Sequence, residues 1–441
     1  MSSRLPYNIN MITSIRNFFI KPFLKTLLNY LSVFIIFSGA FSWYNFEFAE
    51  IRIMYFIIIF FLLYWLLIFK YNLFFNKNFL LLLSFIFLTS FYNVLIGRNA
   101  YTLFLKQSIG ILLNSLFFYL LFKFNDYDVK RLFIIYLNIA FVIALIGIFY
   151  EISFLLKFKQ AYTFMYYIPK WKFVVDPETG LMRVNSILPE PADFANVMIP
   201  AFFISLLSFY KNTFKLQTKI KSTIIIIAFI LTLSPVAYIG IIFCFMLLVF
   251  NYLRNKYIIL FSLTACLLIL TLIINRGQIR SKITQPIGML IEKKELVELN
   301  VSAFALCSNA MVAFYSFKQN PLFGSGVGSH DKTYHMYFNS IFTGSKEIPS
   351  QKPLNTKDAY SFFLRLLSET GLFGITAFFI FIFRFYISRK KDLTGYLWII
   401  SNAILSMFFF KLIRMGNYFV DGFFFFIWMY YFSKIRLRLI A

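Results

Sequence analysis

Apolar runs of about 20 residues recur along this chain, and short charged segments separate them. A run of that length is what an α-helix needs to cross the hydrocarbon core of a bilayer. Hydrophobic residues make up 60% of the 441 residues and charged residues only 14%, so a soluble core could not cover the apolar side chains. The sequence therefore predicts an all-α integral membrane protein.

The expected spans number about twelve, and two long polar segments interrupt them. The spans are expected at 27–43, 51–69, 78–96, 102–122, 132–152, 193–210, 221–233, 235–252, 257–275, 371–388, 395–413 and 417–432. Arg365 and Glu369 interrupt an apolar stretch that is longer than one span requires, so 360–370 is expected to form a separate interfacial helix. The polar segments are 153–192 and 276–358, and the second divides the chain into parts 1–275, 276–358 and 359–441.

The basic residues set the expected orientation. The net charge is +25, and most lysines and arginines fall in short loops on one side of the predicted bundle. Cytoplasmic loops carry this excess in membrane proteins, so both long polar segments are expected on the outer side. Because topology explains the charge, nucleic acid is not an expected partner. The isolated cysteines, and two histidines without paired carboxylates, argue against a disulfide framework or a metal site.

Four cations are expected near the outer ends of the spans. A charge at this depth is costly unless it faces a partner or a polar cavity. Together they would fit a pyrophosphate, because a guanidinium group matches two phosphate oxygens and stays charged. These cations are Arg183, Arg365, Lys411 and Arg414. The alternative is a set of ion pairs, in which Arg365 pairs with Glu369, Arg414 with Asp421, and Arg183 with Glu190 or Asp193.

A glycine-rich segment lies within the second polar segment, at 320–328. Gly324, Gly326 and Gly328 are not followed by Lys-Ser or Lys-Thr, so a nucleotide-binding loop is not expected. The glycines instead predict a tight turn that approaches a ligand or a neighbouring helix closely. His330 follows the turn, and an imidazole can act as a general base, although a lone histidine is more often incidental.

Three short stretches, 183–195, 320–330 and 366–374, resemble the O-antigen polymerase and O-antigen ligase superfamily of bacterial inner membranes. The resemblance implies a fold like that of the GT-C glycosyltransferases, with two large extracytoplasmic loops. It also implies glycosyl transfer from an undecaprenyl-pyrophosphate-linked oligosaccharide. A second lipid-linked repeat unit is the acceptor in polymerases, and the lipid A core is the acceptor in ligases.

The ligase signature is incomplete in this chain. Ligases typically show His followed by Asn, Ser or Gln, then nine residues, then Gly-x-x-Gly. Gly371 and Gly374 place that pair at Tyr360 and Ser361, so the histidine is missing and a polymerase is favoured. The ligase and a lipid-linked oligosaccharide flippase are the alternatives. Transporters usually centre their polar residues near the bilayer midplane, whereas the cations here lie near the outer ends.

The resemblance implies a direct inverting transfer without a metal or a cofactor. The donor's pyrophosphate leaves, and fixed cations stabilise its developing charge. The expected pyrophosphate ligands are Arg183, Arg280, Arg365, Lys411 and Arg414, with further substrate contacts from Tyr360 and Gly326. The general base is expected to be His330, Glu190 or Asp358. The implied partners are the lipid-linked donor and acceptor, membrane lipids, a chain-length regulator and a flippase.

Overall fold

A computed structural model describes residues 22–45, 50–69, 77–210, 216–252, 301–342 and 353–440. These residues form fifteen α-helices and one two-stranded antiparallel ribbon. Four of the described helices are long and apolar enough to cross a membrane, and five shorter apolar helices accompany them. The chain is therefore an all-α, multi-pass membrane protein. Arg280 and the expected span 257–275 lie outside the described residues, and the total of twelve spans stays a prediction.

The long apolar helices lie close to where the sequence predicts them. The four that meet the length and composition of a span are α4 (Lys77–Leu95), α5 (Tyr101–Phe124), α6 (Val129–Leu155) and α8 (Pro191–Tyr210). The five shorter apolar helices are α2 (Pro22–Phe34), α3 (Ile53–Phe69), α10 (Pro235–Tyr252), α16 (Gly371–Phe385) and α17 (Leu397–Ile413). Two further helices of the bundle are α9 (Lys219–Ile230) and α18 (Phe423–Ile440).

Further helices lie in the two polar segments and after the second one. The first polar segment holds α7 (Gln160–Thr163), and the second holds α13 (Val301–Gln319) and α14 (His330–Phe342). A separate helix, α15 (Phe362–Glu369), is present where the sequence predicts one, and its interfacial location stays a prediction. The Ser361 side chain caps its first turn by accepting a hydrogen bond from the Leu364 N–H at 3.1 Å. Thr370 follows this helix, and Gly371, with a φ of +59°, begins α16.

The expected limits of the first and last spans are wrong, and local features explain where the first helix ends and where the last begins. The first span ends at Phe37 in a 3₁₀ turn, and the chain then enters the ribbon of β1 (Ser42–Asn45) and β2 (Glu50–Arg52). The Ser38 hydroxyl donates to the Ile35 carbonyl at 2.8 Å, which helps to end the helix. The last helix begins at Phe423 rather than at Asn417, because Met415 and Asp421 both adopt a positive φ.

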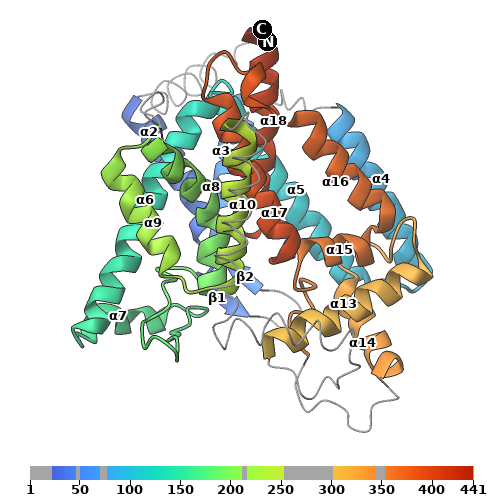
Figure 1. Cartoon of the computed structure of the whole chain (residues 1–441). Helices are drawn as coiled ribbons and strands as arrows, with labels where there is room; N and C mark the ends of the chain where they lie inside the picture. The colour runs from blue at the N-terminus through green and yellow to red at the C-terminus, as the bar shows by residue number, and fades with distance from the viewer. Residues whose placement is uncertain are drawn as a thin grey trace, which may run out of the picture.

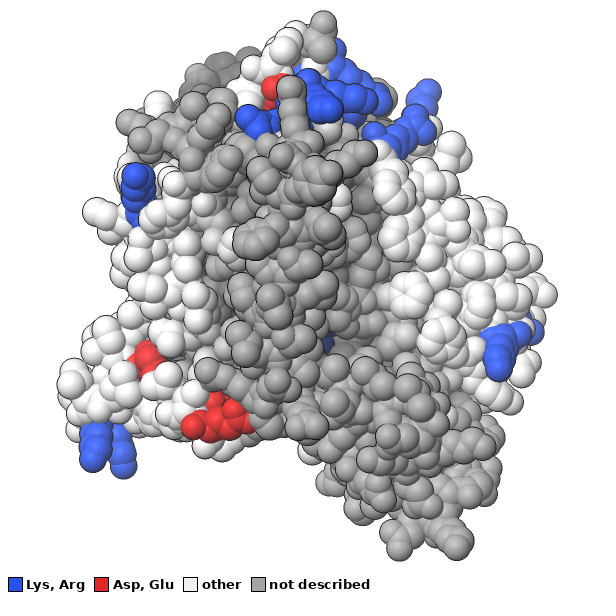
Figure 2. Space-filling view, in the orientation of Figure 1, with Lys and Arg blue, Asp and Glu red and all other residues white. Residues whose placement is uncertain are grey.

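The helices form one bundle with two distinct ends. Figure 1 shows α5, α8, α17 and α18 in the centre, α2, α6 and α9 on one side, and α4 with α16 on the other. The C-terminus lies at one end, and α7, α13 and α14 lie at the opposite end, which we call the loop end. Lysine and arginine side chains gather near the C-terminal end (Figure 2). This distribution agrees with the predicted inward and outward ends.

The two sequence segments 320–330 and 366–374 pack directly against each other at the loop end. The Ser325 N–H donates to the Ser368 carbonyl at 2.9 Å, and the Gly326 N–H donates to the Glu369 carbonyl at 2.8 Å. A side chain added at Gly371 would lie 2.6 Å from the Pro321 carbonyl oxygen. The glycines are therefore needed for close backbone approach between two segments that are far apart in sequence.

This packing predicts a clear difference between two glycine substitutions. Gly371→Ala must place a Cβ against the Pro321 backbone and also adopt a positive φ. Gly180→Ala adopts a similar φ of +70° but meets nothing within 4 Å. We expect Gly180→Ala to cost about 1 kcal/mol from backbone strain alone, and Gly371→Ala to cost about 2 to 3 kcal/mol more. Chemical unfolding in detergent micelles measures both values, and equal costs would contradict the close approach.

Candidate functional site

A buried ion pair lies at the centre of the loop end. Arg365 Nε donates to Glu369 Oε1 at 3.0 Å, and Arg365 Nη1 donates to the Gly416 carbonyl at 3.0 Å. The guanidinium group also lies 4.2 Å from the centre of the Tyr418 ring. Only 1% of the Arg365 side chain is exposed. The predicted ion-pair alternative for Arg365 is therefore confirmed, and a contact with pyrophosphate stays a prediction.

Glu369 also fixes the glycine-rich turn. Its Oε2 accepts hydrogen bonds from the Tyr418 hydroxyl at 2.7 Å and from the Gly328 N–H at 2.8 Å. On the other side of the turn, the Val327 N–H donates to the Ser90 hydroxyl of α4 at 3.0 Å. Gly326 is packed against Ser90, so the turn approaches a helix closely, which was one of the two predicted possibilities. A substrate contact by Gly326 stays a prediction.

His330 is part of the same packed region. Its Nδ1 lies 2.8 Å from the Ser368 hydroxyl, and its Nε2 lies 3.1 Å from Asn309 Oδ1. The imidazole is fully buried. Burial, assisted by the charge of Arg365, lowers the pKa of His330 to about 3. These contacts join α13, α14 and α15, and the low pKa makes His330 a weak base at neutral pH.

The lowered pKa of His330 predicts a pH dependence of stability. The unfolded chain binds a proton below pH 6.5, but the folded imidazole does so only near pH 3. Folding is therefore unaffected above pH 6.5 and loses stability as the pH falls toward 3. We expect the wild type to lose about 2 kcal/mol more than His330→Gln between pH 7 and pH 5. Chemical unfolding at both pH values measures this, and parallel losses would contradict a buried neutral histidine.

Arg183 is held in a loop that is tied to the end of α9. Its Nε donates to the Thr232 carbonyl at 3.2 Å, and its backbone N–H donates to the Val174 carbonyl at 2.8 Å. Burial lowers the pKa of Arg183, while the charges of Asp176 and Glu190 act in the opposite direction. An arginine stays charged under such shifts, so the loop presents a fixed cation.

Arg414 lies against Tyr360 at the end of α17. The guanidinium carbon lies 4.0 Å from the centre of the Tyr360 ring, and Nη1 donates to the Tyr360 carbonyl at 3.4 Å. Asp358 is next to this pair. Its Oδ1 accepts from the Tyr360 N–H at 3.2 Å, and its Oδ2 accepts from the Asn417 amide at 3.5 Å. The half-buried Asp358 carboxylate therefore has weak partners.

Lys411 is fully buried one turn before Arg414. Its ammonium group lies 5.2 Å from the centre of the Phe423 ring and has no hydrogen-bond partner among the residues that the structure describes. The side chain of Asn196 in α8 donates to Asp421 Oδ2 at 2.9 Å, which holds Asp421 in place. The acids that act electrostatically on Lys411 are Asp193, Asp358 and Asp421.

Glu190 lies in the first polar segment and interacts electrostatically with Arg414 at the end of α17. Lys172 forms an ion pair with it. Burial acts to raise the pKa of Glu190, but the hydrogen bond and charge of Lys172 outweigh it, together with the charges of Arg414 and Arg183. The pKa of Glu190 therefore lies below its ordinary value, and the carboxylate stays ionised. A lowered pKa makes Glu190 a weaker base and a better counter-ion for the two arginines.

Acids and bases from four separate segments thus interact at the loop end. We call this group the loop-end charge cluster, and it consists of Arg183, Glu190, Asp193, Asp358, Tyr360, Lys411, Arg414 and Asp421. Arg365 adjoins it through an electrostatic interaction with Lys411. Non-glycine residues with a positive φ gather in the same segments, namely Ala359, Tyr360, Met415 and Asp421. Such backbone strain is typical of functional sites.

The sequence identified the cations of this cluster but not two polar residues that hold the nearby acids in place. Asn196 and Tyr418 carry no charge, and no spacing in the sequence links them to Asp421 or Glu369. Their roles depend on contacts between residues 225 and 49 positions apart. No family model matches the sequence, and no curated protein is significantly similar to it.

Proposed function

We propose that this protein polymerises lipid-linked glycans at the outer face of a bacterial inner membrane. The donor would be a glycan on undecaprenyl pyrophosphate, and the acceptor would be a second lipid-linked repeat unit. One observation carries the proposal: Arg183, Lys411 and Arg414 belong to one charge cluster at the end of the bundle opposite the basic C-terminal end. Fixed cations within such a cluster can stabilise a pyrophosphate leaving group at a membrane surface.

The reaction forms one carbon–oxygen bond, breaks another and transfers the hydroxyl proton to a base. An acceptor hydroxyl attacks the anomeric carbon of the donor glycan, and the bond between that carbon and the pyrophosphate oxygen breaks. The bonding electrons leave with the pyrophosphate, where Arg183 and Arg414 would stabilise the added negative charge. The attack occurs opposite the leaving group, so the anomeric configuration inverts.

Asp358 is the best candidate for the base that accepts the hydroxyl proton. His330 is fully buried with both ring nitrogens engaged. Glu190 forms an ion pair with Lys172, and its pKa is lowered. Asp358 is half-buried, and its two oxygens accept hydrogen bonds at 3.2 and 3.5 Å. A carboxylate with long hydrogen bonds can exchange them for a substrate hydroxyl at low cost.

A reconstituted reaction tests the proposal. Purified protein in liposomes would be incubated with lipid-linked repeat units and no nucleotide, and the products would be separated by size. We expect a ladder of longer glycans that stay on the polyprenyl lipid. Transfer to an added lipid A core acceptor would instead indicate a ligase. Movement of intact units across the bilayer without elongation would indicate a flippase.

A further inference from the structure

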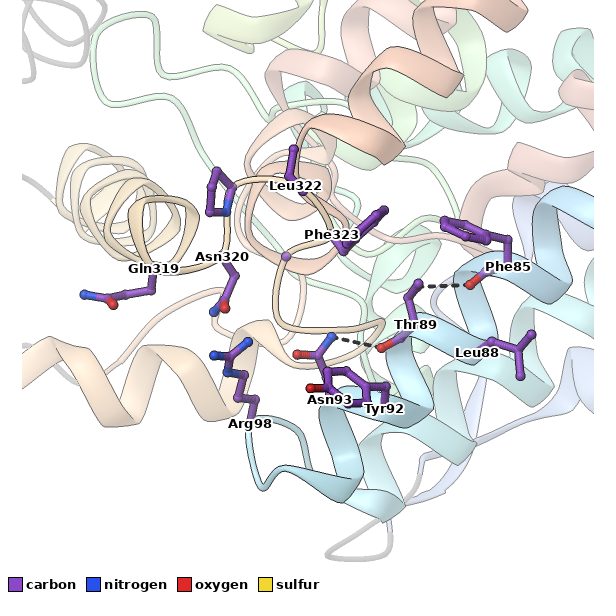
Figure 3. A pocket seen from close by; sticks show the side chains of 12 residues that line it. Phe85, Leu88, Thr89, Tyr92, Asn93, Arg98, Gln319, Asn320, Leu322 and Phe323 are labelled. Atoms are coloured by element: carbon purple, nitrogen blue, oxygen red, sulfur yellow. Dashed lines mark hydrogen bonds between the residues drawn. The ribbon is translucent and has the colours of Figure 1, made fainter.

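A groove of about 600 Å³ lies between α4 and the segment that follows α13 (Figure 3). Phe85, Leu88 and Tyr92 of α4 line one wall, and Leu322 and Phe323 line the other. None of these side chains belongs to the loop-end charge cluster. The groove is therefore a separate feature of the molecule.

The apolar part of the groove is open and partly aromatic. Leu88 is 68% exposed and Tyr92 is 60% exposed, although both lie on a helix that is apolar enough to span a membrane. The Phe85 ring contacts Phe323 and Phe373 with ring centres 5.6 and 4.6 Å apart. Exposed apolar side chains on a spanning helix face lipid, so the groove is accessible to a hydrocarbon chain.

The other end of the groove is polar and positive. Arg98 follows α4, and Figure 3 shows its guanidinium group directed toward Asn320. Within the described part of the chain, Arg98 makes no ion pair, and the buried Asn93 Oδ1 accepts no hydrogen bond. Lys332 adds a second positive charge nearby by donating to the Gly97 carbonyl at 2.6 Å. This end offers positive charge to an anion.

We infer that the groove binds the polyprenyl phosphate part of the acceptor, with the prenyl chain along α4 and the phosphate group at Arg98. The inference rests on the proposed function, because a polymerase must hold two lipid-linked glycans at once. The loop-end charge cluster would bind the pyrophosphate of the donor, which leaves in the reaction. The groove consists of different residues and would bind the pyrophosphate of the acceptor, which stays intact.

Photolabelling of the full chain tests this inference without requiring glycan transfer. The probe is a polyprenyl phosphate with a diazirine on its prenyl chain, presented in phosphatidylcholine nanodiscs. The labelled peptides are identified by mass spectrometry. Arg98→Gln removes the charge, Arg98→Lys retains it, and Arg438→Gln removes an exposed charge at the C-terminal end as a matched control. Leu88→Trp fills the groove while leaving Arg98 in place.

We expect labels on α4 and on residues 319–324 in the wild type, in Arg98→Lys and in Arg438→Gln. Labelling should fall on the order of ten-fold in Arg98→Gln, as expected for the loss of a charge-assisted contact, and it should also fall in Leu88→Trp. Equal labelling of Arg98→Gln and the wild type would overturn the site. Displacement by phosphatidylglycerol at the same concentration as by unlabelled polyprenyl phosphate would overturn the choice of lipid.

The two proposals fail in different ways. If labelling depends on Arg98 but glycans are never elongated, the lipid site is supported and the polymerase function is wrong. If glycans are elongated but labelling does not depend on Arg98, the polymerase function is supported and the groove is not the acceptor site.

Discussion

Arg183→Gln is expected to lower the rate of glycan elongation by about 10²- to 10³-fold, the usual cost of removing one donor that stabilises a developing negative charge. Arg183 is fixed by the Thr232 carbonyl and interacts electrostatically with Glu190, and the proposed function assigns it to the leaving pyrophosphate. The effect should fall mainly on kcat, because the charge on the leaving group grows in the transition state. Polymer length and yield in the reconstituted reaction measure it.

Two further variants separate charge from folding. Arg183→Lys retains a positive charge but loses the forked geometry, so it should retain more activity than Arg183→Gln. Lys159→Gln removes an exposed charge from the same polar segment and should leave elongation unchanged. If Arg183→Gln elongates glycans as fast as Lys159→Gln, with both proteins equally stable, Arg183 has no part in the transfer.

Glu369→Gln should produce the largest loss of stability, about 3 to 5 kcal/mol, because it leaves Arg365 buried without its counter-ion. The Glu369 carboxylate accepts hydrogen bonds from Arg365, from the Tyr418 hydroxyl and from the Gly328 N–H. One substitution therefore weakens the contacts among α15, the glycine-rich turn and the segment before α18. Chemical unfolding in detergent micelles measures the loss.

An exposed ion pair supplies the matched control. Asp126 lies 3.8 Å from Lys25, and its side chain is 93% exposed, so Asp126→Asn should change stability by less than about 1 kcal/mol. Arg365→Met combined with Glu369→Gln should cost less than Glu369→Gln alone, because no unpaired charge is left buried. A double variant that is less stable than Glu369→Gln alone would show that Arg365 stabilises the fold by other contacts.

The lengths of the apolar runs, and the charged residues and glycines that interrupt them, determined most of the helices of this protein. Runs of apolar residues can satisfy their backbone polar groups in a membrane only by forming helices, so α4, α5, α6 and α8 are readable from the chain alone. The break at Gly371 was also readable, because Arg365 and Glu369 interrupt the apolar stretch before it. The ribbon of β1 and β2 was not, since its pairing joins short segments with no apolar run.

The sequence also determined that charges would lie near the two ends of the bundle, since they are excluded from its apolar middle. Only the tertiary structure decided how each charge is used. Arg365 lies in a buried pair with Glu369, whereas Arg183 and Arg414 act together on Glu190. His330 looks like a free base in the sequence, but burial keeps it neutral. Burial and distance between remote segments decide whether a charge is neutralised, and neither quantity is encoded in local spacing.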